Sequence, residues 1–123
     1  MISYNTPFWR KQGLAGVGLG NTPWIELCAD SSDPESGNGV IATFVVGDRY
    51  KRWQLLSDRD RRSAVLSDLA TYFGEEALSP VTYDAIDWTA DPWTGGAYSA
   101  FMPPGVWTGY GDALVEKKIN YAT

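Results

Sequence analysis

The stretch Val40-Ile41-Ala42-Thr43-Phe44-Val45-Val46 decides the fold. It is rich in β-branched residues and is followed at once by Gly47-Asp48, so it predicts a strand with a sharp end. Residues 2–4 and 24–30 predict two further strands, and the turn-rich residues 31–39 join the second of them to this stretch. These segments together predict an antiparallel meander.

The sequence after this strand predicts helices. Residues 49–55 suit a short helix, and Ser57 is placed to cap a longer one whose first turn carries Asp58 and Asp60. Residues 81–88 return as a strand. This order predicts an α+β fold with a mixed, largely antiparallel sheet and helices packed on one of its faces. The apolar residues of the longer helix share one face, and Gly74 ends it: Val65, Leu66, Leu69, Ala70, Phe73.

Length and composition limit what this chain can be. Its 123 residues fit a single domain, 1–123. The start has no basic and apolar leader, and no apolar run approaches the roughly 18 residues of a membrane span, so a cytoplasmic protein without a membrane partner is expected. The net charge of −5 and the scattered basic residues argue against nucleic acid. With Cys28 as the lone cysteine and no histidine, we expect no metal site and no Ser-His-Asp or Cys-His catalysis.

A glycine-rich stretch, Gly13-Leu14-Ala15-Gly16-Val17-Gly18-Leu19-Gly20, invites comparison with a dinucleotide-binding loop. Gly16 and Gly18 match two glycines of G-x-G-x-x-G, but Asn21 stands at the third position and Pro23 follows where a helix should continue. The apolar and glycine residues alternate with period two. This pattern favours a twisted strand over a phosphate loop.

The most distinctive segment is Asp87-Trp88-Thr89-Ala90-Asp91-Pro92-Trp93-Thr94-Gly95-Gly96-Ala97-Tyr98, followed by Ser99-Ala100-Phe101-Met102-Pro103-Pro104-Gly105. Aromatic residues, paired glycines and paired prolines crowd together where an ordinary loop would be polar. We therefore expect an irregular backbone that packs against something flat. Asp87 and Asp91 are candidates for amine recognition, although capping of the loop is the favoured role for both.

These residues resemble the flavin-dependent amine oxidase (monoamine oxidase-like) family, in the C-terminal part of its substrate-binding domain. The matching pieces occur in the family's order along nearly the whole chain. They are Pro7-Phe8-Trp9, Phe44, Tyr72-Phe73-Gly74, Pro80-Val81-Thr82-Tyr83, Asp87-Trp88, Gly95-Gly96-Ala97-Tyr98 and Pro103-Pro104-Gly105.

The resemblance implies oxidative deamination of amines by FAD, and it assigns roles to residues. Tyr98 would be one wall of the aromatic cage that holds the amine, and Phe44 would line the substrate cavity. Burial in the core remains an equal alternative for Phe44 and Trp88. Ala97 replaces a cysteine that bonds to the flavin in some members, so FAD would be held noncovalently. The implied cofactor-binding residues are Trp88, Gly95, Gly96 and Ala97.

The departures from the family are equally informative. The dinucleotide fingerprint is absent, a lysine near the flavin would precede Met1, and the second cage aromatic would follow Thr123. We therefore expect a partial substrate-binding domain with no catalytic residue of its own, which depends on a companion FAD-binding chain or self-associates. Two alternatives stay open: a carbohydrate-type module that uses some of the six tryptophans, and a protein-interaction domain.

Overall fold

The computed structural model describes residues 1–98 and 102–115, without the side chains of residues 114 and 115. The chain divides into two compact units, Met1–Ala85 and Ile86–Thr123, and each is described by itself. The expected single domain 1–123 stays a prediction.

The first unit is built on a five-stranded sheet. Its strands lie in the order β2-β3-β4-β1-β5, so the predicted strand at residues 40–46 forms the middle of the sheet. Every pairing among these strands is antiparallel. The strands are β1 (Ile2–Tyr4), β2 (Gly18–Leu19), β3 (Leu27–Asp30), β4 (Gly39–Phe44) and β5 (Thr82–Tyr83).

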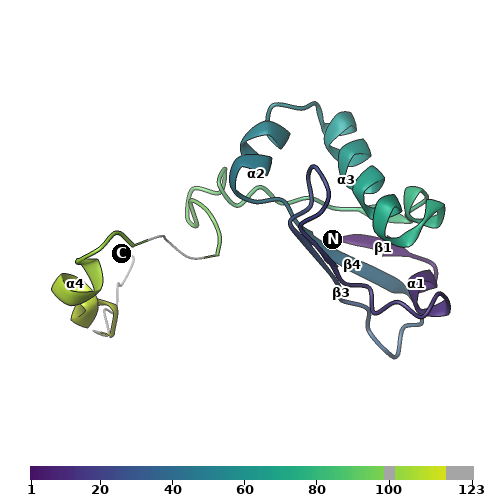
Figure 1. Cartoon of the computed structure of the whole chain (residues 1–123), viewed down its shortest axis with the longest axis horizontal. Coiled ribbons are helices and arrows are strands. Elements are labelled where there is room, and N and C mark those ends of the chain that lie inside the picture. Colours follow the sequence, from purple (N-terminus) through teal and green to yellow (C-terminus); the bar gives the residue numbers. More distant parts are fainter. Residues whose placement is uncertain (99–101, 116–123) are drawn as a thin grey trace, which may run out of the picture. The chain divides into compact units, whose positions relative to one another are not determined.

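Helices cover one face of this sheet. They are α1 (Phe8–Lys11), α2 (Gly47–Trp53), α3 (Asp58–Phe73) and the 3₁₀ turn η1 (Glu75–Leu78), and α3 is the longest of them (Figure 1). The predicted cap of α3 is confirmed, because the Asp60 amide donates to Ser57 Oγ over 3.2 Å. Gly74 ends the helix with a φ of 88°, which only glycine adopts easily. The predicted α+β fold is therefore confirmed.

The core lies between the sheet and α3 and centres on Trp9, which is completely buried. Its ring centroid lies 5.1 Å from that of Phe8, 5.9 Å from Tyr4 and 6.0 Å from Phe73. These edge and tilted contacts are the arrangements that aromatic rings prefer. The apolar face predicted for α3 is confirmed, since Val65, Leu66, Leu69 and Phe73 are buried in this core.

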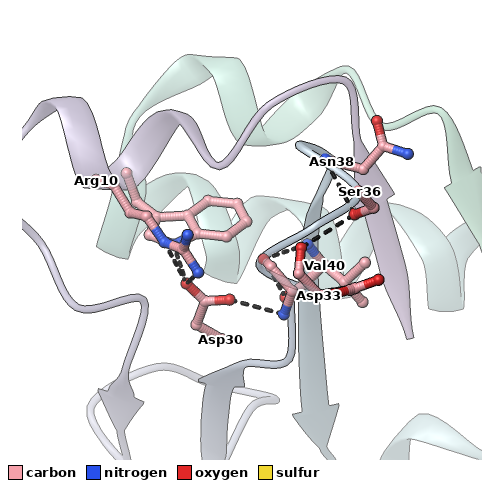
Figure 2. Close-up of polar contacts among 8 residues, drawn as sticks. Arg10, Asp30, Asp33, Ser36, Asn38 and Val40 are labelled. Carbon is pink, nitrogen blue, oxygen red and sulfur yellow. Dashed lines mark hydrogen bonds and ion pairs between the residues drawn. The ribbon is translucent and has the colours of Figure 1, made fainter.

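A polar network ties α1 to the end of β3 (Figure 2). One carboxylate oxygen of Asp30 accepts hydrogen bonds from Trp9 Nε1 at 2.9 Å and from the Arg10 guanidinium at 2.8 and 3.0 Å. Its other oxygen accepts the Ser32 amide at 2.8 Å. The loop that follows is held by its own turns, in which the Glu35 amide donates to Asp33.

Several predicted strands are shorter in the structure than expected, and β4 ends at Phe44, before Val45 and Val46. Residues 24–26 precede β3 instead of belonging to it. The Trp24 and Ile25 amides donate to the Asp68 carboxylate, whereas the Glu26 amide donates to the Phe44 carbonyl at 2.9 Å. Only Thr82 and Tyr83 of the predicted strand at 81–88 pair, both with β1.

In its described residues, 86–98 and 102–115, the second unit combines turns with one helix. The predicted capping of this loop by aspartates is confirmed: Asp87 accepts the Thr89 amide at 3.0 Å, and Asp91 accepts the Trp93 and Thr94 amides at 2.9 Å. These hydrogen bonds lower the pKa of Asp91, those from Thr94 most. After the paired prolines, the chain forms α4 (Val106–Val115).

Candidate functional site

The sheet has an apolar face on the side away from α3. Gly18 and Cys28 pair with each other and face α3, since a Cβ on Gly18 would lie 3.0 Å from the Tyr72 ring. Successive side chains of a strand point to opposite faces, so the next pair, Leu19 and Leu27, points the other way. Leu27 also pairs with Phe44. Leu19, Leu27 and Phe44 thus form a continuous row across three strands, here called the apolar row.

The apolar row places a predicted site residue on an accessible surface. Phe44 and Leu27 are half-buried, and Leu19 is 68 % exposed. Phe44 is therefore not part of the buried core of the first unit. Sequence reasoning missed Leu19 and Leu27, because period-two alternation shows which residues share a face of one strand but not which strands lie side by side.

The remaining predicted site residues lie in the second unit. Trp88 is 43 % exposed and Tyr98 is 72 % exposed. Gly95 and Gly96 have φ values of 61° and 148°, and a Cβ on either would meet no atom within 4 Å. Their backbone is thus open to close approach by a flat ligand. The peptide bond between Ala97 and Tyr98 is cis.

The structure also contains a hollow of about 450 Å³ between residues 22–26 and the start of α2. None of the predicted site residues lines it. Its two guanidinium groups already have protein partners: Arg49 pairs with Glu26 and donates to the Gly20 carbonyl at 2.9 Å. Arg52 lies 5.5 Å from the centre of the Trp24 ring and donates to the Pro23 carbonyl at 3.3 Å. This hollow therefore does not have the free cations of an anion site.

Titratable groups offer little further chemistry in the described part of the chain. Burial raises the pKa of the Cys28 thiol to about 11, against a smaller lowering by the Gly18 hydrogen bond, so the thiol stays neutral at neutral pH. Within residues 1–98 and 102–115, no three acidic or cysteine side chains come together as metal ligands. No helix in those ranges is long and apolar enough to cross a membrane.

Comparison with known families agrees with this arrangement. The model of the family described as flavin containing amine oxidoreductase matches residues 1–121. The chain belongs to this flavin-containing family. The predicted family resemblance is therefore confirmed.

Relatives of this chain in the family are considerably longer. The L-amino acid dehydrogenase of Synechocystis sp. is 68 % identical over 114 residues, which cover 93 % of this chain and 24 % of that protein. The putrescine oxidase of Kocuria rosea is 38 % identical over 97 residues, covering 79 % of this chain and 20 % of that protein. The chain thus spans a fifth to a quarter of the length of these relatives.

Solved structures of the family share the fold. A putrescine oxidase bound to putrescine superimposes with a TM-score of 0.81 at 35 % identity, over 90 % of this chain and 25 % of that one. The cyclohexylamine oxidase from Brevibacterium oxydans gives a TM-score of 0.83 at 31 % identity, over 92 % and 25 % of the two chains. This chain therefore shares its fold with these two oxidases.

Proposed function

We propose that this chain is part of the substrate-binding domain of an FAD-dependent enzyme that deaminates amino acids or related amines oxidatively. The apolar row carries the proposal. Leu19, Leu27 and Phe44 form a continuous apolar surface on the sheet face that the helices of the first unit leave open. Such a surface suits one wall of a cavity that excludes water from a reacting amine.

The residues of the second unit suit the neighbourhood of a flavin. Gly95, Gly96 and Ala97 carry little or no side chain, and a Cβ at either glycine would have open space around it, so a planar ring fits against this backbone. FAD, when bound, accepts the hydride equivalents of the amine. Ala97 has no thiol, so this segment would hold FAD noncovalently, with Trp88 against it. The exposed ring of Tyr98 would orient the substrate nitrogen.

The proposed substrate class is the L-α-amino acids. Its support is the 68 % identity to a relative named L-amino acid dehydrogenase, against 38 % to one named putrescine oxidase. The chain itself would contribute a wall and an aromatic contact but no group that performs the redox step. We therefore expect it to act with a flavin-binding chain.

A reconstitution experiment tests this proposal. The purified chain is mixed with FAD, and its visible spectrum is recorded before and after addition of an L-amino acid or cyclohexylamine. We expect neither tight flavin binding nor bleaching of the flavin by the chain alone. Turnover by the isolated chain would contradict the proposal that it is one partial domain. A neighbouring reading frame that carries G-x-G-x-x-G would supply the companion chain for the same assay.

A carbohydrate-binding module is the second candidate, and the exposure of Trp93 favours it. This side chain is 94 % exposed, as in rings that stack on sugars. Tryptophan fluorescence is titrated with oligosaccharides and, separately, with L-amino acids and cyclohexylamine. A saturable response to sugars alone, lost in Trp93→Ala and retained in Trp107→Ala, would favour the module over the amine site. Trp107 is the matched control because it is also exposed, at 65 %.

A further inference from the structure

Asp68 is a buried carboxylate in an otherwise apolar part of α3. Only 3 % of the residue is exposed, between the buried Val65 and Leu69. Its Oδ2 accepts two hydrogen bonds of 2.8 Å, from the backbone amides of Trp24 and Ile25. In the described part of the chain no lysine or arginine forms an ion pair with it. Burying a carboxylate costs free energy unless hydrogen-bond donors satisfy it. The structural role of Asp68 is therefore its contact with the Trp24 and Ile25 amides.

Tyr72, one turn further along α3, contacts the segment between β2 and β3 at a second point. Its hydroxyl lies 3.3 Å from both the Asn21 amide and Thr22 Oγ1. Thr22 Oγ1 in turn donates to the Ile25 carbonyl over 3.2 Å. The Tyr72 ring packs directly on Gly18, where an added Cβ would come within 3.0 Å of it. Asp68 and Tyr72 therefore hold the hairpin that β2, residues 20–26 and β3 form against α3.

The contacts of Asp68 and Tyr72 with this hairpin determine where the apolar row lies. Leu27 begins β3 immediately beyond the gripped residues 24 and 25, and it pairs with Leu19 on one side and Phe44 on the other. Among the described residues, β2 is an edge strand whose one partner is β3, so the sheet alone restrains it weakly. Further restraint on the hairpin comes from the helices, where Asp68 and Tyr72 of α3 act alongside Arg49 and Arg52 of α2.

We propose that Asp68, with Tyr72, is a positioning residue that clamps the β2–β3 hairpin and so sets the shape of the apolar row. That the apolar row is a wall of the substrate cavity rests on the proposed function. That Asp68 and Tyr72 position the hairpin does not. Without the carboxylate, the amides of Trp24 and Ile25 would be buried donors without an acceptor. The hairpin would then open locally while the middle of the sheet stays closed.

Hydrogen exchange on the full chain, followed residue by residue by NMR, tests the clamp. In Asp68→Ala we expect the amides of residues 24–28 to exchange roughly 10- to 100-fold faster, the change expected from losing a hydrogen bond to a charged group. Amides of β1 and β4 should change far less. Asp68→Asn keeps an oxygen acceptor in the same place, so its effect should be smaller, and this variant serves if the alanine variant does not fold. Ser67→Ala, at the exposed neighbour on α3, is the matched control.

A fluorine label at Phe44 reports on the apolar row in the same variants. We expect its ¹⁹F signal to shift or broaden in Asp68→Ala, to recover largely in Asp68→Asn and to be unchanged in Ser67→Ala. Equal acceleration of exchange throughout the sheet, or an unchanged Phe44 signal in Asp68→Ala, would overturn the positioning role. Titration of the labelled wild-type chain with an L-amino acid tests the proposed function separately, because the exchange result does not depend on it.

Discussion

At the scale of single residues, the structure depends on polar groups that meet specific partners. Asp30 joins α1 to β3 through Trp9, Arg10 and Ser32 (Figure 2). Burial alone would raise the pKa of Asp30, but the hydrogen bonds from Ser32, Trp9 and Arg10 outweigh it and lower the pKa to about 2. The ionised carboxylate is therefore the form that stabilises the fold.

The stability contributed by Asp30 should depend on pH. Its folded pKa lies below the unfolded value near 3.9, so the contribution is fully present above about pH 4 and is lost as the pH falls toward 2. Asp30→Asn should lower the free energy of unfolding by about 1–3 kcal/mol at pH 7. Urea unfolding from pH 7 to pH 2.5 should show this difference shrinking with acidity. A difference that stays constant would contradict the argument, and Asp33→Asn, in the exposed loop, is the control.

Gly39 is a position at which a single added carbon should matter. A Cβ there would lie 2.7 Å from the Thr6 carbonyl oxygen and 2.8 Å from Pro7 Cα, so backbone would have to move. Gly39→Ala should destabilise the first unit by roughly 1–3 kcal/mol. A Cβ added at Gly109, inside α4, would meet no atom within 4 Å. Gly109→Ala should therefore be neutral or slightly stabilising. Thermal melts of both variants check this contrast.

At the scale of elements, α3 is the part that local sequence specifies best. Its cap, its apolar face and its end at Gly74 all follow from residues close in sequence. The short strands β2 and β5 are different, because two paired residues carry too little local pattern to set their own bounds. The same helix also holds Asp68, whose burial no local pattern signals, since an acidic residue is usually exposed.

The cap of α3 should contribute measurably to stability. Ser57 Oγ accepts the Asp60 amide at 3.2 Å and contacts the Asp60 carboxylate at 2.7 Å. Ser57→Ala should lower the free energy of unfolding by about 1 kcal/mol. Ser63→Ala, on the exposed side of the same helix, should change it by less than about 0.5 kcal/mol. Urea unfolding of the two variants checks this. Equal decreases in their free energies of unfolding would contradict the cap assignment.

At the scale of the molecule, the open sheet face is the surface that a partner would cover. An apolar surface that continues over several strands favours association, with a flavin-binding chain or with a second copy. Leu19 is its most exposed member, at 68 %. The expectation of self-association therefore has a defined surface on which it can be tested.

Self-association should depend on this face. At high protein concentration we expect light scattering to report an average mass above the 13.5 kDa of one chain. Leu19→Lys should return the mass toward 13.5 kDa, because a charge would have to be buried in the contact. Leu55→Lys changes a leucine that is 83 % exposed and lies outside the sheet, and it should leave the mass unchanged. A monomeric wild-type chain at high concentration would contradict this expectation.

The sequence alone determined the family, the α+β class, the cap and end of α3 and the middle strand. These features rest on residues within one segment, where period, capping and motif order act directly. Tertiary structure alone decided that Leu19, Leu27 and Phe44 share one face and that Asp68 is buried against residues 24 and 25. Strand partners and buried polar contacts join residues far apart in the chain, so they depend on how the whole sheet and helix pack together.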